Sequence, residues 1–328
     1  MRLANCTNCF TPVEKGEGVK CNACNHFIHR DCAIKASGTF FCDLCYTVQL
    51  ETPKTLEFEL PERIRRTYIE IYRTCPQKFF KEVLQGHTQP PTCYTQIGID
   101  LHDLFEKAVL DPSFRISEFL DAWSQIWLNY PDELFESQEQ MQNMSQRAID
   151  SIETFYEVLP TLDKVFTTEE TITYSVGDDV PNVEFTMDLI TENAQGNLDM
   201  HDWKTGNVMV GKKISSDLQA PLYIYGVQQH FNRQVDSFTF YYLKENKTRR
   251  FDRVDDDTFV CRVGKREYFI HLTDTIKEIK RIFNQIKKGN FNIPQDTRSM
   301  YFACKMCHLR AQNLCMGADE EAWAMLNN

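Results

Sequence analysis

Cysteine and histidine occur in closely spaced pairs over the first 45 residues, and this pattern limits what the segment can fold into. The pairs are Cys6–Cys9, Cys21–Cys24, His29–Cys32 and Cys42–Cys45. Zinc takes four thiolate or imidazole ligands in a tetrahedron, and two such pairs make one site. Four pairs therefore predict a small N-terminal finger that is held together by two structural zinc ions.

The composition indicates a globular chain that stays inside the cell. Of its 328 residues 42% are hydrophobic, and no apolar run approaches the ~18 residues that a membrane-spanning helix needs. The start, MRLANCTNCF, has neither the apolar core of a secretory signal nor arginine-rich transit character. We therefore expect an intracellular protein with no membrane partner, in a bacterial or phage-infected cytoplasm rather than a nucleus. The clustered pairs among its 13 cysteines indicate metal ligands rather than disulfides, with Cys93 and Cys261 left over as ordinary thiols.

The net charge of −11 argues against a protein that binds nucleic acid through bulk electrostatics. Bound cations can reverse the local charge of an acidic site, so a metal-dependent enzyme that acts on nucleic acid is not excluded.

The character of the chain changes near residue 160. Before it, apolar and aromatic residues recur at helical spacing; after it, several segments alternate as strands do. Strands are predicted over 164–176, 183–192, 196–206 and 235–245, and helices over 215–231 and 272–289. This order predicts an α/β fold with a mixed sheet flanked by helices.

The predicted domains follow from these changes. Residues 1–46 form the finger, 47–60 a linker and 61–328 the large domain. Within the large domain, 114–160 is a helical insertion and 300–316 contains a C-terminal cysteine cluster.

The stretch HDWKTG, residues 201–206, carries the strongest chemical signal. Side chains alternate across a strand, so Asp202 and Lys204 share one face, while His201 and Trp203 point the other way and pack. A hairpin with the preceding strand brings Asp188 beside Asp202. Two carboxylates on neighbouring strands suit Mg²⁺ or Mn²⁺, and an adjacent lysine can position a water or offset charge on a phosphate.

Six motifs resemble, in order, those of the PD-(D/E)XK nucleases of the RecB type, a group that includes AddB, exonuclease V and the iron–sulfur CRISPR-associated nucleases. They are TYIEIYRTCPQKF, GIDLHDLFE, FTMDLI, DWK, LQAPLYIYG and KKGNFNIPQ, and the resemblance spans residues 67–315. It implies a restriction-endonuclease-like core and phosphodiester hydrolysis.

The resemblance also implies roles for individual residues. His102, Asp188, Asp202 and the carbonyl of Trp203 would bind one or two Mg²⁺ or Mn²⁺ ions. Asp188, Asp202 and Lys204 would form the catalytic set, with Lys204 assisting the attacking water.

Two further residues of the motifs lie one turn apart on a predicted helix. Gln219 and Tyr223 occupy positions i and i+4, so they share a helix face. By resemblance they would contact or support the DNA backbone near the site.

The last cysteines, Cys304, Cys307 and Cys315, supply three thiolates. The resemblance implies that Cys75 is the fourth ligand of a [4Fe–4S] cluster that joins the two ends of the domain. The final spacing is seven residues where the family usually has five, and four thiolates also bind zinc, so zinc stays an alternative.

The ligand order of the N-terminal finger, four cysteines, one histidine and three cysteines, resembles a PHD finger. That resemblance implies a cross-brace, with Cys6, Cys9, His29 and Cys32 on one ion and Cys21, Cys24, Cys42 and Cys45 on the other. Reading of histone tails and docking of a protein partner are both open, whereas the ligand order argues against a ubiquitin-ligase RING.

Together these features predict a Mg²⁺- or Mn²⁺-dependent DNA exonuclease on single-stranded or end-containing DNA, with some endonuclease activity possible. Replication, recombination or repair is the expected setting. No Walker A motif occurs, so a helicase would be a separate partner. The alternative is a non-catalytic scaffold that binds nucleic acid while its finger recruits a protein.

Overall fold

The computed structural model describes residues 2–9, 11–14, 16–22, 26–36, 39–43, 45, 58–89, 91–293, 303–305, 307–312 and 314–315. They divide into two compact units: the described parts of Met1–Glu59 with those of Ile293–Cys307, and Leu60–Asn292 with His308–Cys315. Most of the predicted linker 47–60, namely residues 47–57, lies outside the described residues. Among those described, no helix is long and apolar enough to span a membrane.

The N-terminal unit consists of short hairpins with little apolar material between them. Its elements are β1 (Arg2–Asn5), β2 (Pro12–Glu14), β3 (Gly18–Lys20), β4 (Phe27–His29), η1 (Arg30–Cys32), β5 (Ile34–Ala36) and β6 (Thr39–Phe41), paired as β1–β2, β3–β4 and β5–β6. Its buried core contains Val13, Ile28 and Phe41 beside four cysteines. So small a core needs cross-links to be stable.

The large unit is built on one mixed sheet of eight strands. The strands are β7 (Arg63–Arg65), β8 (Lys164–Tyr174), β9 (Asn182–Glu192), β10 (Leu198–Lys204), β11 (Val235–Tyr242), β12 (Lys247–Arg253), β13 (Thr258–Val263) and β14 (Arg266–His271). Their order is β14-β13-β12-β11-β10-β9-β7, with β8 also paired to β9. The strands β10 and β11 are parallel, which requires a crossover, and a helix supplies it.

One edge of strand β9 is paired along only part of its length. Strand β8 pairs with β9 from Val183 to Glu192 and occupies one edge. Strands β10 and β7 must therefore share the other edge, β10 pairing with residues 189–192 and β7 with residues 182–184. Residues 185–188 are left without a strand partner on that edge, and the predicted metal ligand Asp188 is the last of them.

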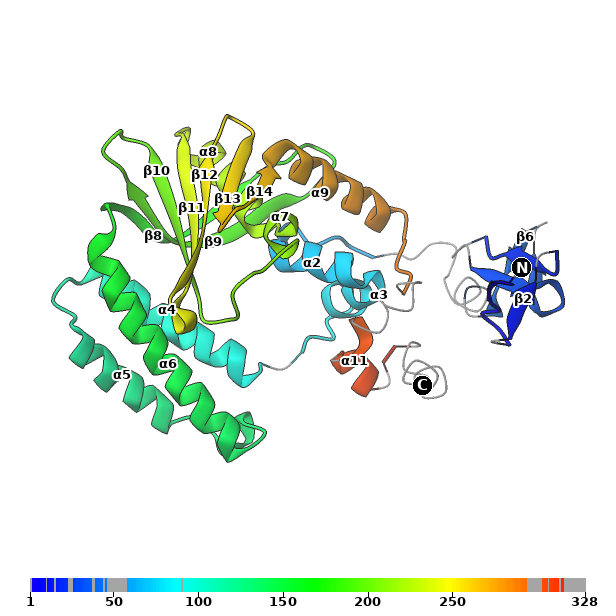
Figure 1. Cartoon of the computed structure of the whole chain (residues 1–328), viewed down its shortest axis with the longest axis horizontal. Helices are drawn as coiled ribbons and strands as arrows, with labels where there is room; N and C mark the ends of the chain where they lie inside the picture. The colour runs from blue at the N-terminus through cyan, green and yellow to red at the C-terminus, as the bar shows by residue number, and fades with distance from the viewer. Residues whose placement is uncertain are drawn as a thin grey trace. The chain divides into compact units, whose positions relative to one another are not determined.

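Helices lie in two groups around this sheet (Figure 1). The helices are α2 (Arg66–Thr74), α3 (Pro76–Phe79), η2 (Phe80–Leu84), α4 (Cys93–Leu110), α5 (Ile116–Leu128), η3 (Asp132–Leu134), α6 (Gln138–Val158), η4 (Leu159–Thr161), α7 (Lys213–Ser216), α8 (Gln219–Phe231), η5 (Leu243–Glu245), α9 (Leu272–Lys287) and α11 (His308–Ala311). Helices α4, α5 and α6 pack on one another, whereas α8 packs on β8, β11 and α9.

An aromatic core joins helices α4, α5 and α6 to strand β10. The Phe155 ring lies 4.3 Å from that of Phe105 and 5.0 Å from that of Trp203. All three side chains are buried in one cluster with Leu189 of β9. Trp203 thus packs as its position on the strand predicted, and α5 and α6 lie inside the predicted insertion, 114–160.

The predicted α/β class and its flanked mixed sheet are confirmed, but the predicted strand order was incomplete. The structure adds β7 and the meander β12–β14 to the four predicted strands. Strand β12, KTRRFDR, buries only Phe251 among its seven residues, so it lacks the apolar alternation on which the prediction relied. Pro76 does mark a helix boundary, since α2 ends at Thr74 and α3 begins at Pro76.

Gly226 on α8 offers a test of how tightly this helix packs on the sheet. A Cβ at this position would lie 2.5 Å from the Phe185 ring and 2.6 Å from the Tyr174 ring. Gly226→Ala should therefore lower the free energy of unfolding by about 1–3 kcal/mol through overpacking, despite the ~1 kcal/mol that alanine gains in a helix. Urea denaturation measures the change.

Gly98→Ala on α4 is the matched control. The nearest atom to its added Cβ is Thr205 Oγ1 at 3.6 Å, an ordinary contact. This variant should be neutral or more stable by up to ~1 kcal/mol. Stabilisation by both substitutions would contradict the packing described for α8.

Candidate active site

Asp188 lies where the ladder between β9 and β10 ends. The last pair of that ladder is His201 with Leu189, so Asp202 and Asp188 are the next residues on the two strands. Instead of continuing the ladder, the Trp203 amide donates a 2.7 Å hydrogen bond to Asp188 Oδ2. On the other side of β9, the Thr168 hydroxyl donates to the Asp188 carbonyl at 2.7 Å. The carboxylate is thereby fixed at the end of the ladder.

His102 approaches Asp188 from helix α4. Its Nδ1 lies 3.5 Å from Asp188 Oδ1. Leu101 and Phe105, which flank His102 on the helix, are fully buried in the α4–α6 core and fix the rotation of α4. Burial lowers the pKa of His102, but the charge and hydrogen bonding of Asp188, together with the charge of Asp202, outweigh burial and raise the pKa to about 9. The imidazole and the carboxylate thus interact strongly.

Asp202 is paired on its own side of the sheet with Lys204. Its Oδ2 lies 2.6 Å from Lys204 Nζ, the two residues sharing one strand face as predicted. Lys204 also donates a 2.9 Å hydrogen bond to Gln219 Oε1, and Gln219 Nε2 donates to Asp202 Oδ1. Gln219 therefore bridges the acid and the amine.

The position of Gln219 is set by the start of α8. Asp217 accepts hydrogen bonds from the amides of Gln219 and Ala220 at 2.9 and 3.1 Å, which satisfies two free donors at the helix N-terminus. One turn later, the Tyr223 ring stacks on Phe185 with centroids 4.0 Å apart. Gln219 and Tyr223 are both buried here, and their contact with a DNA backbone stays a prediction.

Glu169 is a site residue that sequence reasoning missed. It has φ +47°, a left-handed conformation that is rare for residues other than glycine. The register that pairs Thr168 with Leu189 and Glu170 with Met187 places Glu169 opposite Asp188. Burial and the charge of Asp188 raise the pKa of Glu169 to about 7.

These groups form a set that fits a divalent cation. One ligand atom each from His102, Glu169 and Asp188 lie within 4.8 Å of one another. Ligands about 2.1 Å from a common octahedral ion lie roughly 3–4.2 Å apart, so a small closure would complete the set. Asp202 lies outside this triplet.

The buried Asp202 carboxylate could nevertheless contact the same cation. Its Oδ2 is buried and, apart from the ion pair with Lys204, has no hydrogen-bond partner among the described residues. Burial raises the pKa of Asp202, the charge of Lys204 lowers it, and the charge of Asp188 raises it again. The net result is a pKa of about 6. A nearby cation would satisfy this oxygen and favour its charged form.

In the N-terminal unit, the predicted ligands gather into two sets. The first set is Cys6, Cys9, His29 and Cys32, and the second contains Cys21, Cys42 and Cys45, each with ligand atoms within 4.8 Å of one another. The fourth predicted member of the second set, Cys24, lies outside the described residues.

His29 has the geometry of a metal ligand. Its Nδ1 lies 3.2 Å from Cys9 Sγ, and its Nε2 lies 3.1 Å from the Pro12 carbonyl. A carbonyl that accepts from the second ring nitrogen fixes the tautomer in which the first can bind a metal. The amide of His29 donates to Cys6 Sγ at 3.3 Å, as amides do beside bound thiolates.

The cysteines predicted to hold an iron–sulfur cluster divide between the two units. Cys75 and Cys315 belong to the large unit, and Cys304 and Cys307 to the other. The cluster therefore stays a prediction from the sequence.

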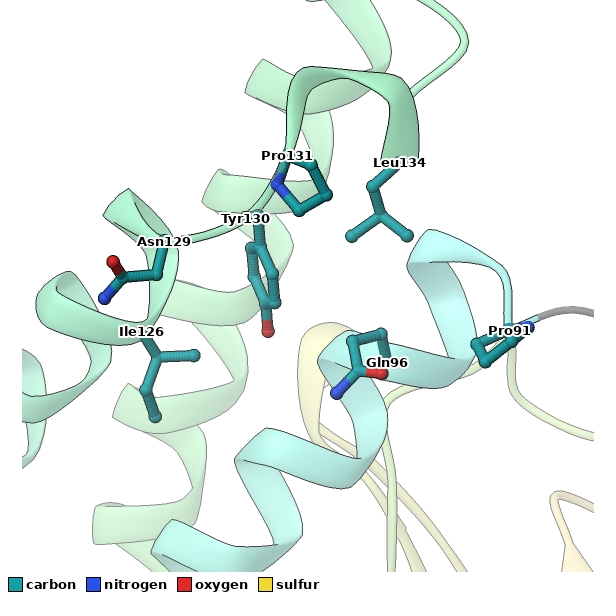
Figure 2. Close-up of a pocket in the computed structure, with 7 residues that line it drawn as sticks. All are labelled: Pro91, Gln96, Ile126, Asn129, Tyr130, Pro131 and Leu134. Carbon is teal, nitrogen blue, oxygen red and sulfur yellow. The ribbon is translucent and has the colours of Figure 1, made fainter.

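A hollow of about 540 Å³ lies away from these charged groups, between the start of α4 and the α5–α6 connection (Figure 2). Its lining includes Pro91, Ile126, Pro131 and Leu134, and no carboxylate, imidazole or cationic side chain. It lacks the groups that phosphodiester chemistry requires.

Comparison with family models agrees with this geometry. The family model described as the PD-(D/E)XK nuclease superfamily matches residues 66–312. No curated protein matches the chain. Among solved structures, "Crystal structure of SSO0001" is similar over 82% of this chain and 91% of that chain, with 11% sequence identity and a TM-score of 0.32.

Glu169 provides a test of the cation site. Glu169→Gln should weaken Mn²⁺ binding about 10- to 100-fold, because the triplet loses one of its two carboxylates. Isothermal titration calorimetry measures the affinity. Glu170→Gln, the neighbouring residue outside the triplet, is the matched control and should bind Mn²⁺ as the wild type does. If Glu169→Gln and Glu170→Gln bind Mn²⁺ with equal affinity, Glu169 is not a ligand of the cation.

Proposed function

The chain belongs to the PD-(D/E)XK nuclease superfamily, and from that premise we propose that it is a Mg²⁺- or Mn²⁺-dependent DNA exonuclease of the RecB type. The observation that carries the proposal is the convergence of His102 and Asp188 with the Asp202–Lys204 pair where the β9–β10 ladder ends. Its substrates would be single-stranded or end-containing DNA, in replication, recombination or repair.

Each residue has a defined task in this reaction. His102, Glu169, Asp188 and Asp202 would hold the cation, with the Trp203 carbonyl as a further ligand. When bound, a divalent cation polarises the scissile phosphate and lowers the pKa of a water. Lys204 is the group on this chain that would orient the attacking water or stabilise charge on the phosphate, since it is an amine beside the site.

Gln219 acts on this reaction through Lys204 and Asp202. Its amide oxygen accepts from the lysine while its amide nitrogen donates to the carboxylate. This bridge limits how far the amine can turn away from the site. The Phe240 ring, 5.3 Å from Lys204 Nζ, further restricts the lysine.

The metal centres outside the active site would be structural. The two cysteine-rich sets of the finger would each bind zinc, which suits the thiolate and imidazole donors. The sequence resemblance to PHD fingers and the small size of the unit support docking of a protein partner. Cys75, Cys304, Cys307 and Cys315 would hold a [4Fe–4S] cluster or, alternatively, a third zinc.

Lys204→Ala tests the catalytic proposal. The wild type should degrade end-labelled single- and double-stranded DNA in the presence of Mg²⁺ or Mn²⁺. EDTA should stop this degradation. The variant should be slower by about 100- to 1,000-fold, the usual effect of losing one group that stabilises the transition state. Lys277→Ala, an exposed lysine on α9, should leave the rate unchanged. A wild type that binds DNA and retains its metals but never cleaves would support the scaffold alternative.

Elemental analysis of anaerobically purified protein tests the structural metals. We expect about two zinc and about four iron atoms per chain, because two tetrahedral sites and one cubane cluster are proposed. Cys21→Ser should lower the zinc content by about one, while Cys93→Ser, at a buried thiol on α4, should not. About three zinc atoms per chain and no iron would indicate that the C-terminal cysteines bind zinc instead of an iron–sulfur cluster.

A further inference from the structure

A narrow groove begins directly beside the catalytic strand. Its volume is about 170 Å³, and Thr205–Asn207, the residues that follow Lys204, form one wall. Helices α4 and α6 and the short helix η5 form the rest, through Tyr94, Arg147 and Lys244 among others. A second hollow of about 220 Å³ lies beside the first and shares Tyr94, Met144 and Arg147 with it, and Glu139 also lines this second hollow.

Two cations line the inner part of this groove. Neither Arg147 nor Lys244 forms an ion pair with a carboxylate in the part of the chain that the structure describes. Burial and the positive charge of Arg147 lower the pKa of Lys244, whereas the charge of Glu245 raises it. Because Arg147 and Lys244 line the same hollow, an anion that binds between them would be attracted by both.

An exposed aromatic ring lies next to these charges. Tyr94, in the first turn of α4, is 54% exposed, although it is a large apolar side chain. An exposed ring beside cations is the arrangement with which proteins hold single strands, the ring stacking on an unpaired base and the cations contacting phosphates. Duplex DNA keeps its bases stacked and could not use the ring in this way.

The walls of the groove are held in place without a ligand. Lys244 donates a hydrogen bond to Asn207 Oδ1, and the Val208 amide donates to Glu245 Oε1 at 3.1 Å. These contacts fasten the loop after the catalytic strand to η5, and α6 packs against η5. The groove is therefore already formed in the free protein.

Helix α4 contributes residues to both the groove and the cation site. Tyr94 precedes His102 by eight residues on the same helix, a rise of about 12 Å. Thr205 follows Lys204 directly on the opposite wall.

We propose that this groove binds the single-stranded part of the DNA substrate, with Arg147 and Lys244 on one backbone phosphate and Tyr94 stacked on an unpaired base. The inference rests on the proposed nuclease function, but binding itself needs no cleavage. The α4–α6 group thereby serves as the substrate-holding part of the domain.

The test measures binding and cleavage separately. Binding of a fluorescent single-stranded oligodeoxynucleotide is followed by anisotropy in EDTA over a range of salt concentrations, and cleavage is followed in Mn²⁺. The double variant R147A/K244A should bind at least tenfold more weakly, and its plot of log K against log salt should be shallower by about 0.7, the contribution of one phosphate. Tyr94→Ala should bind about tenfold more weakly without a change in slope, and Tyr94→Phe should bind as the wild type does.

The matched control is K265A/R266A, which removes the same charge from the exposed turn between β13 and β14. It should bind with wild-type affinity and slope, and thermal melting of all variants shows that they are folded.

Two results would overturn the proposal: R147A/K244A that binds like K265A/R266A, or wild-type protein that does not bind single-stranded DNA. If the wild type binds but does not cleave, while R147A/K244A loses binding, the groove stands and the nuclease function fails.

Discussion

The β9–β10 ladder stops after His201 and Leu189, and the rest of the site depends on this break. Because β7 and β10 share one edge of β9, the strands can separate there without leaving a long unpaired edge. At this gap, Asp188 accepts a hydrogen bond from the Trp203 amide, which would instead bond to the backbone of β9 if the ladder continued. Asp202 and Lys204 then continue past the break, where a cation and a phosphate could reach them.

The helices on both sides of the sheet depend on the same break. On one side, burial of Trp203 among Phe105 and Phe155 fixes α4, and α4 carries His102 to Asp188. On the other, Asp217 starts α8 so that Gln219 reaches Asp202 and Lys204. Burying several charged groups together is costly unless they are paired. In the free protein they are paired with one another, and a bound cation would compensate the carboxylates.

Strand alternation was sufficient to predict the shared face of Asp202 and Lys204 and the packing of Trp203, because both follow from a period of two. The neighbouring position of Asp188 was predicted from the pairing of two consecutive strands in a hairpin. Glu169 could not be predicted in this way. A register shift between Val165 and Thr167 changes which side chains face Asp188, so the sequence does not show whether Glu169 or Glu170 does. Gln219 and Asp202 lie on elements that are separated by a loop, so the local periodicity of the sequence could not predict their contact. Strand β12 was missed because charged residues flank Phe251, its one buried residue, so the segment shows no apolar alternation.

If the break in the ladder creates a cation site, Mn²⁺ should bind beside Asp188. Diffraction from Mn²⁺-soaked crystals, with data collected at the manganese absorption edge, tests it most directly. We expect an anomalous peak about 2.1–2.3 Å from Asp188, with His102 and Glu169 as further ligands and Asp202 turned toward it. Bound manganese elsewhere on the molecule, with no peak at Asp188, would contradict the account.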